Sequence, residues 1–195
     1  FSFVDKKPGQ APQLFIMEVG KAPDSPGQAL RHKPQPLPLP KESDVAGASN
    51  DFPVSIVASE KHDMLYIVTK LGFVYLYDIH TANVVFRCRI AENPVFIAAA
   101  HESSNGVLAI TAQQGAVMHV QINEANLVPY ILGTLNNTEL GMKLAARLNL
   151  PGADQLYQQR LNDLLTANNV AGAAQLAASA PALRTQDTIR RFQAL

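Results

Sequence analysis

Histidines, one cysteine and the carboxylates are the residues of this chain whose chemistry could serve catalysis or metal binding. No histidine stands at metal-ligand spacing from another histidine or from the cysteine, and the five histidines are His32, His62, His80, His101 and His119. The sequence contains no glycine-rich phosphate loop and no nucleophile elbow. Most carboxylates fall in turns, where an aspartate can bond its own backbone. These patterns predict no enzyme, no cofactor and no metal site.

Cysteine usage and charge restrict the partners and the compartment. Cys88 lies in an apolar and aromatic strand pattern, which favours a small buried side chain over a reactive thiol. A single cysteine cannot form an internal disulfide, so a reducing, cytoplasmic compartment is expected. The 16 basic and 16 acidic residues cancel, and no basic stripe indicates a nucleic-acid partner. The chain opens at Phe1 inside a strand pattern, and we interpret it as an internal fragment.

Short strand patterns begin the chain. Strands are expected at residues 1–4 and 14–19, and a proline-rich stretch follows over residues 21–50. Alternating prolines from Pro34 to Pro40 exclude a helix and remove ladder donors, so an extended surface loop is expected there. The alternative interpretation is a ligand for a proline-recognition domain.

A unit of four short strands then repeats with a period near 40 residues. The expected strands lie at 53–59, 64–69, 73–79 and 84–90 in the first unit, and at 94–100, 107–112, 116–122 and 127–130 in the second. Gly72-x-Val74 returns 43 residues later as Gly115-x-Val117. Four strands at such a period are typical of β-propeller blades. We predict about three blades of a partial β-propeller over residues 1–130.

Helical periodicity replaces the strand pattern after Pro129. Leu140, Leu144 and Leu148 stand one turn apart, and Asn137 is the expected N-cap. Further helices are expected around Leu156 to Leu165, over 170–179 and after Thr185. Short amphipathic helices joined by short breaks predict an α-helical linker, the start of an α-solenoid, over residues 131–195.

A propeller that runs into a solenoid fits three kinds of protein. One is a vesicle-coat scaffold, the second is another coat or a nuclear-pore scaffold, and the third is a propeller enzyme or lectin-like domain with a site in its channel. The third needs converging polar groups on the innermost strands. Those strands read Pro53-Val-Ser-Ile-Val and Pro94-Val-Phe-Ile-Ala, which are mostly apolar and disfavour it.

Specific motifs narrow this choice. Ser-Glu-Lys-His-Asp at 59–63 and Arg-Thr-Gln-Asp-Thr-Ile-Arg-Arg-Phe at 184–192 closely resemble clathrin heavy chain, as does the stretch 69–78. The resemblance runs in one register from Phe1 to Leu195, apart from a longer and more proline-rich loop at 21–50. It implies the C-terminal blades of a seven-bladed terminal-domain propeller, followed by the first linker helices of the leg.

The resemblance also implies a function. It implies a non-enzymatic structural protein of clathrin-coated pits and coated vesicles, active in endocytosis and intracellular protein transport on the cytoplasmic face of the membrane. Adaptor and accessory proteins would dock short linear motifs between blades and supply the peripheral membrane association. Clathrin light chain and two further heavy chains would complete a homotrimeric triskelion in the full-length protein.

Two peptide-binding grooves are implied within this part of the chain. Lys21 matches a rim position of a groove for leucine-rich motifs of arrestin type, and His32 and Lys33 match the basic pair in its following loop. Val74 and Arg89 would contribute to a groove between the last two blades. The alternative interpretation is that the three loop residues are solvated charges, that Arg89 covers apolar surface with its stem and that Val74 is core.

Overall fold

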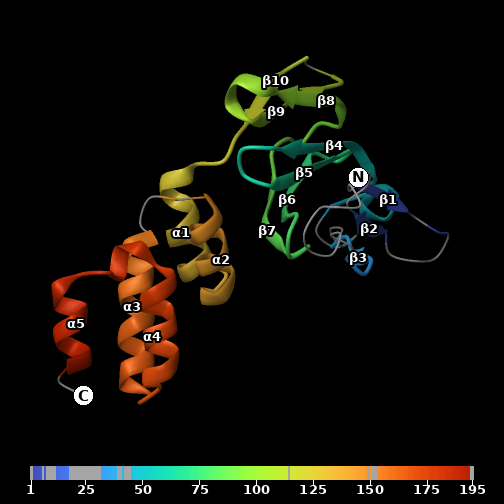
Figure 1. Ribbon diagram of the computed structural model, residues 1–195. Coiled ribbons are helices and arrows are strands. Elements are labelled where there is room, and N and C mark those ends of the chain that lie inside the picture. Colours follow the sequence, from blue (N-terminus) through green and yellow to red (C-terminus); the bar gives the residue numbers. More distant parts are fainter. Residues whose placement is uncertain are drawn as a thin grey trace, which may run out of the picture. The chain divides into compact units, whose positions relative to one another are not determined.

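The computed structural model describes residues 2–5, 7, 12–17, 32–38, 41, 45–113, 115–148, 150 and 153–193. The chain divides into two compact units, Phe1–Ile122 and Asn123–Leu195. Three antiparallel sheets build the first unit, and the described part of the second unit holds five α-helices (Figure 1). This order confirms the predicted fold class of partial propeller-like blades followed by a helical linker. Within the described residues, no helix combines the length and the apolar character needed to cross a membrane.

The middle sheet has four strands and follows the predicted pattern to within one residue at each end. Its strands, in spatial and chain order, are β4 (Pro53–Ser59), β5 (Met64–Thr69), β6 (Phe73–Asp78) and β7 (Val84–Arg89). All residues of β5 and β6 are buried. These strands are rich in valine, tyrosine and leucine because both faces of the sheet are covered, and such side chains suit a pleated, buried surface.

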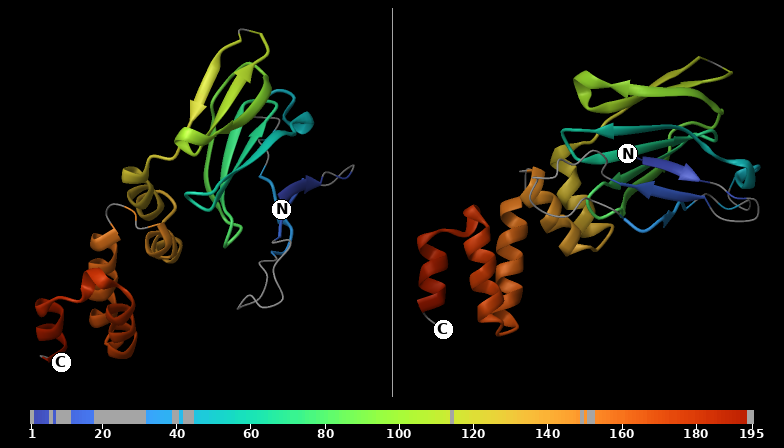
Figure 2. Two further views of the ribbon diagram at one scale, coloured as in Figure 1. Left: turned by 45° about the horizontal axis from the view of Figure 1, so that its top comes forward. Right: turned by 45° about the vertical axis from the view of Figure 1, so that its right-hand side comes forward.

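A three-stranded sheet flanks the middle sheet on either side. The first consists of β1 (Ser2–Asp5), β2 (Gln13–Ile16) and β3 (Gln35–Pro36), and the other of β8 (Val95–His101), β9 (Gly106–Thr111) and β10 (Val117–Val120). Strand β4 lies beside β1 on one side and beside β8 on the other (Figure 2). The first strands of successive sheets are therefore neighbours, which is the arrangement of propeller blades around an axis.

One predicted strand is wrong. Residues 127–130 were expected to form the fourth strand of the last unit, but they lie in helix α1 (Glu124–Gly133). Leu127, Val128 and Ile131 are buried along one side of that helix, and a four-residue apolar run does not by itself distinguish a strand from a helix. The expected domain boundary at residue 130 falls inside α1, whereas the second compact unit begins at Asn123.

The remaining helices lie where the periodicity predicts them. They are α2 (Thr138–Leu148), α3 (Ala153–Thr166), α4 (Val170–Ser179) and α5 (Gln186–Gln193). The Asn137 side chain caps α2, because its Oδ1 accepts a hydrogen bond from the Leu140 amide at 3.0 Å. Leu161, Ala173, Leu176 and Leu183 form a shared core of α3, α4 and the turn that follows. The small alanine side chains of α4 allow the two helices to approach closely.

Within the proline-rich stretch, residues 32–38 are extended as expected and pack against the sheets, whereas Ala48–Asn50 at its end form a short 3-10 helix. Strand β3 pairs with β2, and an edge strand of two residues tolerates proline because few ladder donors are needed there. Leu37 is buried in one core cluster with Leu14, Ile16 and Tyr75. We call residues 32–38 the proline-rich segment, which fills part of the seam between the first two sheets.

Candidate peptide-binding site

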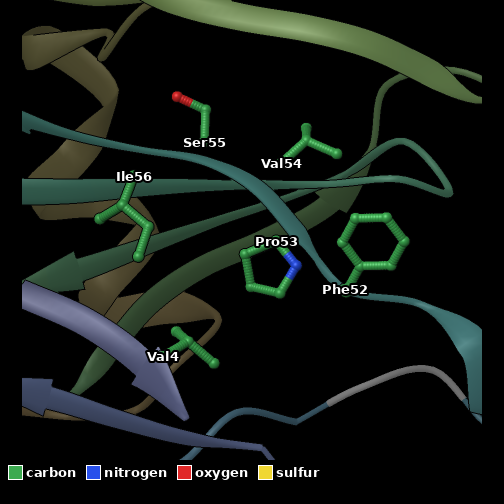
Figure 3. A pocket seen from close by; sticks show the side chains of 6 residues that line it. All are labelled: Val4, Phe52, Pro53, Val54, Ser55 and Ile56. Carbon is green, nitrogen blue, oxygen red and sulfur yellow. The ribbon is translucent and has the colours of Figure 1, made fainter. Parts of the chain in front are cut away.

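An apolar pocket lies between the first strands of the first two sheets (Figure 3). Its volume is about 340 Å³, and it is lined by Val4 of β1 together with Phe52, Pro53, Val54, Ser55 and Ile56 at the start of β4. Ser55 contributes the one side-chain hydroxyl, and no charged side chain belongs to this lining. Apart from this hydroxyl the side chains of the pocket are apolar, and polar atoms, including those of the backbone, make up a comparable share of its lining.

Local sequence explains the shape of this pocket. The pairing of β4 with β5 shifts between Pro53 and Ser55, so Val54 is an extra residue that locally bends the strand, as in a β-bulge. Pro53 fits the first position of the strand because it has no N–H to donate. Phe52 stands before it with 47% of its surface exposed. An aromatic side chain is thereby placed at the rim of the pocket.

The buried carboxylate of Asp51 holds this rim in place. Its Oδ1 accepts hydrogen bonds from the backbone amides of Phe52 at 3.0 Å and of Leu71 at 2.9 Å. Leu71 belongs to the turn between β5 and β6, so one carboxylate joins the entry of β4 to that turn. A pocket with a fixed rim loses less conformational entropy when a ligand binds.

Two arginines form a second feature near the seam. The guanidinium groups of Arg87 and Arg89, on one face of β7, lie 5.9 and 5.7 Å from the centroid of the Phe73 ring. Arg89 Nε donates to the Leu71 carbonyl at 3.2 Å, and its Nη2 donates to the Glu92 carbonyl at 3.1 Å. Both side chains are exposed, so they present fixed positive charge that suits carboxylates.

The basic residues expected at the first groove have different surroundings. Lys21 lies outside the described residues. His32 is half-buried, and its Nε2–H donates to the Ile79 carbonyl at 2.8 Å while its backbone N–H donates to the Ile16 carbonyl at 3.2 Å. Lys33 beside it is exposed. His32 thus fastens the proline-rich segment to the middle sheet, and Lys33 keeps a solvent-facing charge.

The two residues expected at the second groove do not share a face of the sheet. Arg89 lies opposite Phe73 and Cys88 lies opposite Val74, and adjacent residues of a strand point to opposite faces. Val74 is 1% exposed, which makes it a core residue here, whereas Arg89 is exposed. Burial also raises the pKa of the Cys88 thiol, in keeping with an unreactive cysteine.

Phe52, Val54 and Arg87 were not singled out from the sequence. The signal that could have found Phe52 is an aromatic residue directly before a proline that opens a strand, whereas Val54 is marked only by the register shift in the pairing of β4 with β5. Arg87 could have been found from its i,i+2 spacing to Arg89 on one strand face. Among the described residues, no group of three or more His, Cys, Asp or Glu side chains could hold a metal ion.

Blade-like sheets followed by paired helices define the class of this protein as one built from repeated structural units. Family models narrow the class. Residues 124–147 match the model described as "Clathrin, heavy-chain linker", and residues 149–195 match the model "Clathrin-H-link". The resemblance noted in the sequence is confirmed: this chain is homologous to a segment of clathrin heavy chain.

Individual relatives support this assignment along nearly the whole chain. Clathrin heavy chain of Drosophila melanogaster is 40% identical over 183 residues, covering 93% of this chain and 10% of that protein. Clathrin heavy chain of Dictyostelium discoideum is 37% identical over 194 residues, covering 98% of this chain and 11% of that protein. The chain therefore spans about a tenth of the length of these relatives.

Solved structures include a similar β-propeller domain, that of Myceliophthora thermophila Cps50 (Swd1). It is 17% identical, with a TM-score of 0.41, and the match covers 63% of this chain and 35% of that one.

Proposed function

We propose that this chain is a coat-building segment of clathrin heavy-chain type, in which the blades bind short peptides and the helices begin a leg. The homology to clathrin heavy chains supports the coat role, because it extends across both compact units. In the full-length protein, adaptor and accessory proteins, clathrin light chain and two further heavy chains are the proposed partners. The proposed location is the cytoplasmic face of coated pits and vesicles, in endocytosis and vesicle transport.

The single observation that carries the peptide-binding part is the apolar pocket between β1 and β4. A pocket of this size accepts one or two aliphatic side chains of an extended peptide. Because β1 and β4 begin their sheets, their outer backbone edges can also accept an added strand. Arg87 and Arg89 offer positive charge to an acidic residue of a peptide. Because a short peptide makes few contacts, its affinity for one chain should be weak, with a dissociation constant between about 10 μM and 1 mM. Simultaneous binding to many legs of one coat would strengthen the overall attachment.

A peptide titration tests this binding. A fluorescent leucine-rich peptide with an acidic flank is titrated against the chain while its fluorescence anisotropy is recorded. Val54→Asp places a charge in the pocket, and we expect it to weaken binding by at least about tenfold. Val117→Asp is the matched control, because Val117 is 62% exposed on β10 and belongs to the other end of the unit. Equal binding by both variants would remove the pocket from the proposal.

The coat role needs a separate experiment, whose outcome does not depend on the pocket. The corresponding segment of the Drosophila heavy chain is replaced by this chain, and assembly of the full-length chimera into cages is followed by sedimentation and electron microscopy. Cages of ordinary yield are expected. A chimera that trimerises but builds no cages would contradict the coat role while leaving the peptide titration valid.

A further inference from the structure

Two histidines of the third sheet converge on one hydroxyl group. His101, the last residue of β8, places Nδ1 2.7 Å from Ser104 Oγ, and His119 of β10 places Nε2 2.6 Å from the same oxygen. The two imidazole rings lie edge to face, with their centroids 4.8 Å apart and an interplanar angle of 73°. Two nitrogen atoms of different strands are therefore directed at a single point.

Sheet pairing and one glycine create this arrangement. His101 lies opposite Gly106 of β9, and His119 lies opposite Leu108 two residues further along β9, so both histidines and Gly106 share one face. A Cβ atom at Gly106 would stand 3.1 Å from Ser104 Oγ and 2.3 Å from the Val120 carbonyl oxygen. Because Gly106 has no side chain, there is space for the Ser104 hydroxyl between the two imidazole rings.

The hydrogen bonds of the Ser104 hydroxyl can be compared with the bonds that a metal ion would form with the two imidazole nitrogens. A serine hydroxyl has one hydrogen. The Ser104 hydroxyl lies within 3.3 Å of the His101 carbonyl oxygen and of a nitrogen of each ring, so at least one of the two rings must donate to it. A metal ion instead accepts a lone pair from each nitrogen. Two imidazoles on a tetrahedral zinc ion, with Zn–N distances of about 2.0–2.1 Å, hold their ring centroids roughly 5 Å apart. The observed separation of 4.8 Å is close to this value. Ser104 Oγ lies between the two nitrogen atoms in this structure, so a bound ion would displace it or take it as a ligand.

We propose that His101 and His119 form a site for a borderline divalent transition-metal ion, Zn²⁺ in the first place, with Ser104 or water completing the coordination. Imidazole nitrogen suits Zn²⁺, Ni²⁺ and Cu²⁺ and disfavours Mg²⁺ and Ca²⁺. Since the site has two histidine ligands, and no set of three His, Cys, Asp or Glu ligands exists among the described residues, it binds an exchangeable ion rather than a structural one.

The surroundings of the site give access to a cation. A cavity of about 380 Å³ lies between the β4–β5 turn and the β8–β9 turn, and its lining includes His101 together with the carboxylate side chains of Glu60 and Glu102. His119 is exposed, and its Nε2 reaches the same Ser104 hydroxyl. Carboxylates near an open site raise the local concentration of cations. The histidines are 18 residues apart in sequence, which is why spacing alone predicts no metal site there.

Calorimetric titration of the untagged 195-residue chain with ZnCl₂ tests the proposal, with NiCl₂ in parallel and MgCl₂ as the hard-cation comparison. We expect one Zn²⁺ per chain and no heat of binding with Mg²⁺. His119→Ala is the main variant because this side chain is exposed and its removal leaves the sheet core intact; it is expected to weaken Zn²⁺ binding by at least about tenfold. His101→Ala is expected to do the same.

His80→Ala is the matched control, because His80 is an exposed histidine that pairs with Asp63 at 3.3 Å and lies in the turn between β6 and β7 of the middle sheet. It is expected to leave Zn²⁺ binding unchanged. Imidazole nitrogen NMR supplies an independent readout, in which Zn²⁺ shifts the signals of His101 and His119 and of no other histidine. Absence of binding by the wild-type chain, undiminished binding by His119→Ala, or loss of binding in His80→Ala would each overturn the proposal.

Discussion

Tyr75 on β6 donates its phenolic hydrogen to the carbonyl oxygen of Pro38 at 3.0 Å, which joins the middle sheet to the proline-rich segment. Arg87 Nη1 donates to the same oxygen at 3.3 Å. Proline has no N–H but keeps its carbonyl acceptor, so Pro38 bonds to the middle sheet as an acceptor, while the amides of His32 and Leu37 donate to the Ile16 and Pro12 carbonyls. With Leu37 buried beside it, the segment is a packed part of the first seam.

Tyr75→Phe tests this fastening. The change removes one donor while Arg87 continues to serve the Pro38 carbonyl, so the free energy of unfolding should fall by about 1 kcal/mol. Urea unfolding followed by circular dichroism measures it. Tyr77→Phe is the matched control, because the Tyr77 hydroxyl is buried and has no hydrogen-bond partner among the described residues. Its removal should leave stability equal or raised, and a larger loss in this control than in Tyr75→Phe would contradict the argument.

Much of the fold could be predicted because its signals are local. The strands of the middle sheet alternate with short turns that contain residues at positive φ, such as Asp63 and Gly72. Asn137 and Asn169 precede two helices, and each side chain accepts a hydrogen bond from an amide three residues later. Caps and turns depend on neighbours in sequence, so the sequence alone indicates them.

Features that depend on distant residues could not be predicted. The apolar pocket needs Val4 beside β4, and the pairing of His101 with His119 needs three strands in one register. Valine is a residue type that suits a peptide groove, but the alternation of side chains along β6 places Val74 in the core. Residues 127–130 have similar local preferences for strand and for helix. They form a helix because one side of α1 is buried, which the sequence alone does not reveal.

Buried tyrosines predict a loss of stability at alkaline pH. Burial raises the pKa of Tyr66 and of Tyr75 from 10.0 to about 12. For Tyr75 the nearby positive charge of Arg87 acts in the opposite direction and lowers the pKa, but burial has the larger effect. Burial also raises the pKa of Tyr77. The unfolded chain loses these protons near pH 10, whereas the folded chain keeps them. Their contribution is therefore complete below pH 10 and is lost as the pH rises from 10 towards 12.

Urea unfolding between pH 8 and pH 11.5 measures this effect, together with the tyrosinate absorbance of the folded chain. Each such tyrosine lowers the free energy of unfolding by at most roughly 1.4 kcal/mol per pH unit above pH 10. Tyr77→Phe should make the decline shallower. Stability that stays constant across this range, or folded-state titration of all tyrosines near pH 10, would refute the assignment.

Gly72 and Gly115 occupy equivalent turns in the two repeats but have different surroundings. Both have positive φ, +80° and +61°, which an alanine adopts at a cost of about 1 kcal/mol. A Cβ at Gly72 would stand 2.4 Å from the Ala91 carbonyl oxygen, whereas one at Gly115 would have no described atom within 4 Å. Gly72→Ala should therefore lower the melting temperature several degrees more than Gly115→Ala does. Equal shifts would show that the close backbone approach does not matter.

The cap of α2 is the basis of the last prediction, because Asn137 Oδ1 accepts a hydrogen bond from the Leu140 amide in the first turn of this helix. Asn137→Ala leaves that amide without its acceptor and should lower the free energy of unfolding by about 1 kcal/mol. Asn137→Asp keeps the acceptor and places negative charge at a helix N-terminus, so it should retain the wild-type stability. Gln159→Ala, at an exposed position of α3, controls for loss of an ordinary polar side chain. Helical circular dichroism during urea unfolding measures all three variants, and an Asn137→Ala chain as stable as Asn137→Asp would mean that the cap does not hold the helix.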